Sequence, residues 1–372
     1  MAKQIKKIVY ILKPSVDIYP PCVSQIRIIK DLGYEIEVWF GHCGAATRSL
    51  LEASGVSMIQ LRFAPDSTTS KVGKLRNWLE YRHAVLKKMK AEDRDHVLFW
   101  FGTAESAIPL FPLDRKRRMV MSVLELMDDR KVSRFLSAHI ARKCIAVTAC
   151  EDNRANIMRF WWNLDRKPFV IPNKPYEIQI SVNAKPSCGE VEEALRLIGD
   201  RPFVIYQGIF QNVEYISKIA YALSQGTDMP LLVMMGSDRR NIVPQIKKIY
   251  KNTIYIQHIQ SPNHLEITSH ALLGVVCYDH SSLNKLYCAP NKIFEYSKFG
   301  IPMLANDVPG LIHTVGAYKA GVCVDFDSQE EVAVGIEKLL VGHDEYSSNA
   351  INYYNSIDNR ETVRRLLEKA TQ

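Results

Sequence analysis

The chain has 372 residues, of which 47% are hydrophobic and 24% charged, and this near-average globular usage excludes disordered, collagen-like and coiled-coil classes. Its length predicts two domains of roughly 150 residues or more, and its formal net charge is +8. No apolar run reaches the roughly 20 residues of a membrane-spanning helix, no signal segment opens the chain, and the eight cysteines include no C-x-x-C pair, so we expect a cytoplasmic protein.

In the first half, short apolar runs rich in β-branched residues alternate with helical patterns, which predicts βαβ units and a buried parallel sheet. The predicted strands cover residues 5–12, 36–40, 58–61, 96–101, 119–123, 145–148 and 169–171. A helix is expected over 21–32, because Gly33 follows it as a typical C-terminal stop.

A second helix is predicted over about 72–89. It places one apolar stripe opposite its basic residues, and the stripe consists of Leu75, Trp78, Leu79, Leu86 and Met89. Two interpretations stay open for this helix. It either lies on a membrane surface with its basic face or covers its own sheet with the stripe.

Positive charge is concentrated in the first half of the chain. Residues 1–175 hold 30 Lys and Arg against 18 Asp and Glu, whereas residues 176–372 hold 18 against 22. The cations cluster at Lys3, Lys6 and Lys7, over 71–90 and over 115–118. This excess predicts an anionic partner, either a membrane surface or a phosphorylated or nucleic-acid ligand; the alternative is solvated charge on helix faces.

The second half repeats the same alternation. Its predicted strands cover residues 203–207, 231–235, 254–257, 273–277, 301–305 and 321–324. The proline-containing stretch 172–187 is the best linker candidate. We therefore expect two doubly wound α/β domains, over residues 1–175 and 176–345, followed by a C-terminal helix over 346–372 that packs back toward the first domain.

Several familiar site motifs are absent. The sequence has no G-x-G-x-x-G after the first strand, no Walker A loop, no G-x-S-x-G and no H-E-x-x-H. The histidines show no metal-ligand spacing with the cysteines. Two D-x-D triplets, at 93–95 and 325–327, are interpreted as turn residues. We expect neither a metal nor a cofactor.

The most informative stretch covers residues 289–305. Pro290 and Asn291 open a helix, Gly300 closes it, and a buried strand follows, so the helix begins at a carboxyl-edge loop of a parallel sheet. Unpaired N–H groups at this end attract a phosphate, and Lys292 adds a full positive charge. One turn further, Glu295 is placed to accept hydrogen bonds from a vicinal diol such as a ribose. The alternative is a helix-favouring surface glutamate.

This segment resembles the donor-site segment of GT-B glycosyltransferases, in particular the retaining family 4 enzymes, in which P-N-K-x-F-E-Y-x-x-x-G-x-P is common. Residues 203–208, 230–237 and 254–259 resemble further strands and glycine turns of their C-terminal domain, and 146–173 resembles the end of their first domain. The resemblance implies two Rossmann-like domains facing a central cleft. It also implies sugar transfer from a nucleotide-diphosphate sugar, linked to UDP or GDP, with retention and without metal.

The resemblance assigns donor-binding roles to individual residues. Gly208 and Gly236, which follow the first two strands of the second domain, would approach the diphosphate. Asn291 and Lys292 would face the phosphates or the sugar. The carboxylate of Glu295 would bind the ribose, and the main chain of Ile259 would bind the base.

Two departures from the family pattern stand out. Family 4 enzymes usually carry an E-x7-E pair, and Tyr287 stands eight residues before Glu295, where the first carboxylate belongs. We count Tyr287 among the donor-binding candidates at that place. After Gly208 no cation appears before Lys218, which leaves Lys292 as the main candidate to stabilise the leaving diphosphate.

In the first domain, Glu125 follows a predicted strand at its carboxyl end. It is a candidate catalytic residue beside Lys292, either orienting a sugar hydroxyl or acting as a base; the alternative is a cap for the next helix. The resemblance implies a glycan or lipid-linked acceptor of cell-surface polysaccharide synthesis, with the basic half at the inner face of the membrane and no nucleic-acid partner. Two other hypotheses are a catalytically degenerate subunit that stabilises a partner, and a nucleotide-sugar epimerase.

Overall fold

The computed structural model describes residues 5–63, 70–113, 117–210 and 212–371, so Lys3, Arg115 and Lys116 of the basic clusters lie outside it. The chain forms two compact units. The N-terminal unit comprises Met1–Glu177 with Asp358–Gln372, and the C-terminal unit comprises Ile178–Ile357. The chain thus passes from one unit to the other two residues after the predicted boundary at 175.

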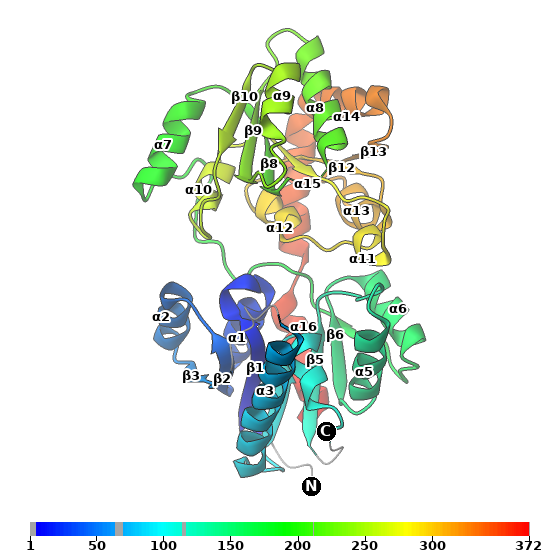
Figure 1. The fold of residues 1–372 in the computed structure, drawn as a ribbon. Helices are drawn as coiled ribbons and strands as arrows, with labels where there is room; N and C mark the ends of the chain where they lie inside the picture. Colours follow the sequence, from blue (N-terminus) through cyan, green and yellow to red (C-terminus); the bar gives the residue numbers. More distant parts are fainter. Residues whose placement is uncertain (1–4, 64–69, 114–116, 211, 372) are drawn as a thin grey trace. The chain divides into compact units, whose positions relative to one another are not determined.

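The N-terminal unit is built on a seven-stranded sheet in the order β3-β2-β1-β4-β5-β6-β7, in which every pair is parallel (Figure 1). Its strands are β1 (Lys7–Ser15), β2 (Glu35–His42), β3 (Ser57–Gln60), β4 (Val97–Phe101), β5 (Arg118–Val123), β6 (Ala146–Ala149) and β7 (Phe169–Val170). The central strand β4 is buried along its whole length, as expected for a sheet covered on both faces. The strand order changes direction between β1 and β4, which is the doubly wound pattern.

Helices cover both faces of this sheet. They are η1 (Val16–Ile18), α1 (Pro20–Asp31), α2 (Ala45–Ala53), α3 (Lys71–Ala91), α4 (Ala104–Ala107), η2 (Ile108–Leu110), α5 (Lys131–Ala141), α6 (Asp152–Trp161) and the C-terminal α16 (Asn359–Thr371). Helices α1 and α16 pack against each other on one face, and α3 lies on the other (Figure 1). Buried Val363, Leu366 and Leu367 bring α16 into the core of this unit.

The face that α3 buries differs from the predicted stripe. Its buried residues are Asn77, Tyr81, Val85 and Met89. Leu75 and Leu79 are instead 58% and 50% exposed. Apolar residues occur on several sides of this helix, so spacing alone did not select the side that faces the sheet. Among the described residues, no helix combines the length and the apolar character that crossing a bilayer requires.

The C-terminal unit contains a six-stranded parallel sheet in the order β10-β9-β8-β11-β12-β13. Its strands are β8 (Phe203–Ile209), β9 (Leu231–Ser237), β10 (Thr253–Ile256), β11 (Leu273–Val276), β12 (Met303–Asn306) and β13 (Gly321–Val324). Alternate strand residues enter two cores: Phe203 and Ile205 pack on one face, Val204 and Tyr206 on the other. The prediction of two Rossmann-like doubly wound domains is therefore confirmed.

The helices of this unit connect its strands and cover both cores. They are α7 (Gly189–Ile198), α8 (Val213–Gln225), α9 (Val243–Ile249), α10 (His264–Thr268), α11 (Leu283–Leu286), α12 (Asn291–Lys298), α13 (Pro309–Leu311) with the π-helical η3 (Ile312–Gly316), α14 (Gln329–Val341) and α15 (His343–Ser356). The segment 346–372, predicted as one helix, is two: α15 packs on α12, and α16 belongs to the N-terminal unit. The break follows Ser356, where Ile357 leaves helical geometry and Asp358 accepts from the Glu361 N–H at the start of α16.

Candidate functional site: a pocket at the carboxyl edge of the C-terminal sheet

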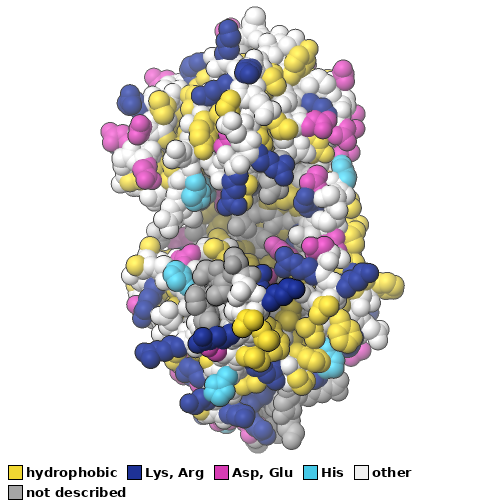
Figure 2. All heavy atoms as spheres, in the orientation of Figure 1, with side chains coloured by type: hydrophobic (Ala, Val, Ile, Leu, Met, Phe, Trp, Pro, Cys, Tyr) yellow, Lys and Arg dark blue, Asp and Glu magenta, His cyan; other side chains and the backbone are white. Residues whose placement is uncertain are grey.

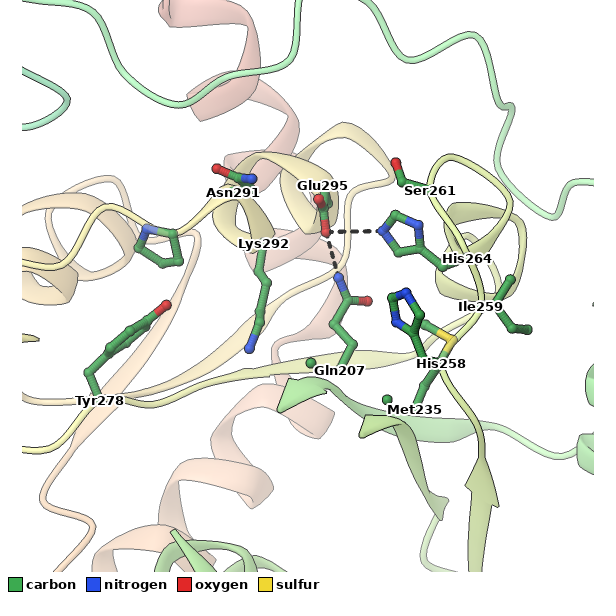
Figure 3. Close-up of a pocket in the computed structure, with 13 residues that line it drawn as sticks. Gln207, Met235, His258, Ile259, Ser261, His264, Tyr278, Asn291, Lys292 and Glu295 are labelled. Carbon is green, nitrogen blue, oxygen red and sulfur yellow. Dashed lines mark hydrogen bonds and ion pairs between the residues drawn. The ribbon is translucent and has the colours of Figure 1, made fainter. Parts of the chain in front are cut away.

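The loops that follow β8, β9 and β10, together with the start of α12, enclose a pocket of about 420 Å³ (Figure 3). Its lining residues are Gln207, Gly208, Met235, Gly236, His258, Ile259, Ser261, His264, Tyr278, Pro290, Asn291, Lys292 and Glu295. Among them are the six residues to which the family resemblance assigns a part of the donor, together with Pro290 at the start of α12. A pocket at this edge is where open α/β sheets bind their ligands.

Lys292 lies in the first turn of α12, whose N-cap residue Pro290 supplies no side-chain cap. Its ammonium is partly buried and 5.4 Å from the centroid of the Tyr206 ring. Among the described residues, no carboxylate forms an ion pair with it, and burial lowers the pKa of Lys292. A desolvated cation beside uncapped N–H groups makes this end of the pocket suited to an anion.

Two glycines bring β8 and β9 together beneath the pocket. Gly208 and Gly236 are register partners, with φ of +115° and +142°. A Cβ on Gly236 would approach the Gly208 carbonyl oxygen to 1.9 Å, whereas one on Gly208 would lie 3.4 Å from the Lys292 Nζ. Gly236 is therefore required by strand packing, and Gly208 leaves open the space that the Lys292 ammonium faces.

Glu295 is held by its neighbours in the middle of the pocket. Gln207 Nε2 donates to Glu295 Oε2 at 2.5 Å, and Thr268 Oγ1 donates to Gln207 Oε1 at 2.8 Å. His264 Nε2 lies 3.8 Å from the same carboxylate oxygen, and the side chains of His264 and Glu295 are 18% and 13% exposed. These contacts fix the Glu295 carboxylate, while Oε1 has no hydrogen-bond partner among the described residues.

The loop after β10 forms the other side of the pocket. It carries His258, Ile259 and Ser261, and Figure 3 shows them across the pocket from Lys292. The Ile259 side chain is 6% exposed, belongs to the hydrophobic core and points away from Lys292 and Glu295. Only its main chain is therefore available to a ligand in the pocket.

Tyr278 lines the pocket beyond Lys292, in the segment that follows β11. Asn306, at the end of β12, accepts from the Tyr278 N–H at 2.9 Å and donates to the Tyr278 carbonyl at 2.6 Å. Tyr287, which stands where the family pattern has the first carboxylate of the E-x7-E pair, is not among the lining residues. It follows α11, and its carbonyl carbon packs 3.0 Å from the Cβ position of Gly310.

The lining residues form three groups that lie one after another across the pocket (Figure 3). The segment 258–261 and His264 lie on one side, Glu295 and Gln207 in the middle, and Lys292 and Tyr278 on the other side. Sequence reasoning had missed Gln207, His258, Ser261, His264 and Tyr278. A signal for Gln207 did exist, since it is a polar residue at the end of an otherwise apolar strand. His258 likewise follows the end of β10, whereas His264 is the first residue of α10 and gives no such signal.

Glu125 belongs to the other unit. It is exposed and follows β5, at the carboxyl edge of the N-terminal sheet. Nearby, the Tyr19 hydroxyl donates to Glu105 Oε2 at 3.4 Å, and Glu105 Oε1 lies 3.5 Å from Arg130 Nη1. Burial and the charges of Glu105 and Glu125 raise the pKa of Tyr19. A set of hydrogen-bonding groups therefore gathers at this edge as well.

The two D-x-D triplets form local turns. Asp95 N donates to Asp93 Oδ1 at 2.8 Å, and Asp327 N donates to Asp325 Oδ1 at 2.7 Å. Across the described residues, no group of three or more His, Cys, Asp or Glu side chains is placed to hold a metal ion.

Solved structures similar to this chain span almost its whole length. HepE from Anabaena, in complex with UDP and glucose, matches with a TM-score of 0.68 at 14% identity, covering 98% of this chain and 99% of that one. A glycosyltransferase from Rickettsia africae matches at 0.67 and 11% identity, covering 98% of each chain. WaaG, a glycosyltransferase involved in lipopolysaccharide biosynthesis, matches at 0.63 and 13% identity, covering 97% of this chain and 98% of its own. No family model and no curated protein matches the sequence. The likeness shows that the chain has the GT-B fold.

Proposed function

We propose that the chain is a glycosyltransferase that moves a sugar from a UDP- or GDP-linked sugar to a glycan or lipid-linked glycan acceptor. The observation that carries this proposal is a pocket in which a desolvated lysine at a helix N-terminus lies beside a fixed carboxylate. The lysine suits a diphosphate, and the carboxylate suits a pair of sugar hydroxyls.

The order of groups across the pocket matches the order of groups in a nucleotide-diphosphate sugar. The base would lie against the main chain of His258 and Ile259, the ribose hydroxyls at Glu295, and the diphosphate at Lys292 and the first N–H groups of α12. The sugar would then extend toward Tyr278. HepE, which has a similar fold, was solved in complex with UDP, and this supports the proposed placement.

The chemistry needs a stabilised leaving group. When the bond between the anomeric carbon and the diphosphate oxygen breaks, its electron pair goes to the diphosphate and negative charge grows there. Lys292 and the N–H groups of α12 lie where that charge develops, and one well-placed donor contributes on the order of 3 kcal/mol. In a retaining course the acceptor hydroxyl attacks from the same face, and its proton passes to the leaving phosphate oxygen. No metal is required for these steps.

The acceptor is assigned to the N-terminal unit. We assign Glu125 the role of orienting the acceptor hydroxyl, because it stands at the carboxyl edge among Tyr19, Glu105 and Arg130. The excess positive charge of this half suits an acceptor or surface that carries phosphates. On these grounds we place the enzyme in the cytoplasm, at the inner face of the cell membrane, in cell-surface polysaccharide synthesis.

Thermal unfolding with nucleotides tests the donor site. UDP or GDP is expected to raise the Tm by several degrees in the presence of EDTA, because a ligand bound only to the folded state stabilises it. Glu295→Ala should abolish this rise. Glu337→Ala, which removes an exposed carboxylate on α14, is the matched control and should leave it unchanged. A full response in the Glu295 variant would remove Glu295 from the site.

A catalytically degenerate subunit is the second candidate. Glu295 is the only carboxylate among the described residues that line the pocket. The first carboxylate of the E-x7-E pair, which would contact the transferred sugar, therefore has no counterpart among them. Release of UDP or GDP from a panel of nucleotide sugars, with and without glycan acceptors, separates the two functions. Nucleotide binding without turnover of any donor would favour the degenerate subunit, and turnover of the donor without an acceptor would favour an epimerase or a hydrolase.

A further inference from the structure

The N-terminal halves of α3 and α5 leave large apolar side chains in solvent. On α3 these are Val72, Leu75 and Leu79, which are 79%, 58% and 50% exposed. On α5 they are Val132 and Phe135, which are 73% and 64% exposed. Single exposed apolar residues are ordinary, but five on two adjacent helices are typical of a binding surface.

The two helices belong to one surface. Arg82 of α3 donates to the carbonyls of Pro109 and Phe111 at 3.0 and 2.6 Å, and the Phe111 ring meets His139 of α5 edge-on at 4.8 Å. The short helix η2 therefore lies between α3 and α5 on the same side of the sheet. Figure 2 shows hydrophobic side chains gathered over this region, with Lys and Arg beside them.

The surface is strongly basic. Helix α3 carries seven Lys and Arg against one acidic residue, Glu80, and α5 carries two cations and no acidic residue. The apolar part of the outer face of α3 passes into a basic part along the helix. There a hollow of about 350 Å³ is lined by Leu79, Arg82, His83, Leu86, Lys87 and Lys90. Apolar side chains thus stand next to a site suited to an anionic headgroup.

We propose that this α3–α5 surface docks on an anionic lipid bilayer. The exposed apolar side chains of the N-terminal halves of α3 and α5 enter the boundary between headgroups and acyl chains, and Arg82, Lys87 and Lys90 contact headgroup phosphates. A nucleic acid would satisfy the cations but would leave Leu75, Leu79 and Phe135 in water. A lipid surface satisfies both kinds of group.

The position of the surface within the unit bears on the acceptor, and this step rests on the proposed function. Both helices begin at the carboxyl edge of the sheet, because each follows the loop after a parallel strand. The loop between β5 and α5 also carries Glu125, and Arg130 is the N-cap residue of α5. Docking through the N-terminal halves of these helices would hold the acceptor edge near the bilayer, which favours an acceptor anchored in lipid over a free sugar.

Vesicle flotation of the full chain tests the docking surface. The protein is expected to bind vesicles of phosphatidylcholine with about 30% phosphatidylglycerol at low salt, and to bind pure phosphatidylcholine vesicles at least about tenfold more weakly. Binding should fall steeply with added salt. Replacing Leu75, Leu79 and Phe135 by Ser, or Lys87 and Lys90 by Ala, should each weaken binding about tenfold or more. Absence of wild-type binding to the anionic vesicles overturns the proposal.

A matched variant controls for surface polarity. Replacing Leu197 and Val341 by Ser changes exposed apolar residues of the C-terminal unit, 53% and 84% exposed, and should leave vesicle binding unchanged. Equal loss in this control and in the α3–α5 variants contradicts the assignment, and so does binding to a nucleic-acid duplex that outcompetes the vesicles. The UDP-induced rise in Tm is measured on every variant. Loss of vesicle binding in the α3–α5 variants with the rise in Tm retained supports the docking surface. If the wild-type chain shows the rise in Tm but does not bind the vesicles, the result counts against the surface alone. If it binds the vesicles but shows no rise in Tm, the result counts against the donor site alone.

Discussion

The carboxyl edges of the two sheets use charge in opposite ways. In the C-terminal unit, Lys292 and Glu295 are directed into a pocket, partly buried, and fixed by Gln207 and the start of α12. In the N-terminal unit, Glu105 and Arg130 form an ion pair with side chains 46% and 55% exposed. Exposed cations such as Lys71, Lys74 and Lys87 stand on α3. Desolvated charge in a shaped pocket discriminates one ligand, whereas exposed charge is screened and acts over a broad surface. The same sheet architecture thus supports two kinds of recognition.

The largest effect is expected from removing the buried cation. Lys292→Met should lower kcat by about 10²–10³-fold, because the charge on the leaving diphosphate loses its main partner. The Tm of the ligand-free protein should not fall, since a desolvated ammonium is removed. Steady-state kinetics and thermal unfolding measure the two quantities. Lys298→Met, at the other end of α12, is the control, and equal kinetic losses in both variants would show that Lys292 has no special role.

The carboxyl edge of the N-terminal sheet should respond through the acceptor. Glu125→Gln is expected to lower kcat by about tenfold or more, because a hydrogen bond between a carboxylate and the acceptor hydroxyl is weakened. The UDP-induced rise in Tm should be unchanged, since Glu125 belongs to the other unit. Asp129→Asn, at the same edge, controls for loss of charge. Wild-type turnover by the Glu125 variant would remove Glu125 from the acceptor site, and since Arg130 is the N-cap residue of α5, Glu125 does not cap that helix either.

A smaller effect is expected from the residue that positions Glu295. Gln207→Met removes the donor to Glu295 Oε2 and the acceptor for Thr268. The KM for the donor should rise about tenfold with kcat changed much less, and the free energy of unfolding should fall by about 1–2 kcal/mol. Gln225→Met, at the exposed end of α8, serves as the control. A fall in kcat with KM unchanged would contradict a positioning role.

The smallest effect concerns pH. Because burial lowers the pKa of Lys292, its charged form costs stability at neutral pH, and this cost is lost as pH rises through the folded-state pKa. A bound diphosphate stabilises the ammonium, so the UDP-induced rise in Tm should shrink as pH rises through that pKa, by about 2–4 °C or less. Thermal scans from about pH 7 to pH 10 measure it. The Lys292→Met variant should show no such dependence beyond that of the nucleotide, and parallel curves for the two proteins would exclude Lys292 as the cause.

The sequence alone determined the strands and the motif at the start of α12. Every strand of the described structure overlaps a predicted range, with ends that differ by three residues or fewer. A strand buried on both faces leaves a short continuous apolar run, and Pro290 with Gly300 delimits α12, so both signals are local in the sequence. The same local signals led to Lys292 and Glu295, and the family resemblance led to Gly208; all three line one pocket.

Only the tertiary structure decided which faces the helices bury and which distant residues meet. Spacing offered Leu75 and Leu79 as core, but packing against the sheet buries Asn77 and Tyr81 and leaves the leucines in solvent. Likewise Gln207 and Glu295 are 88 residues apart and come together only because β8 ends beside α12. Periodicity describes a helix one turn at a time, whereas burial depends on the neighbour that covers each side. For this reason the sequence predicted the elements and the binding motif, while the network around Glu295 and the exposed α3–α5 surface required the folded chain.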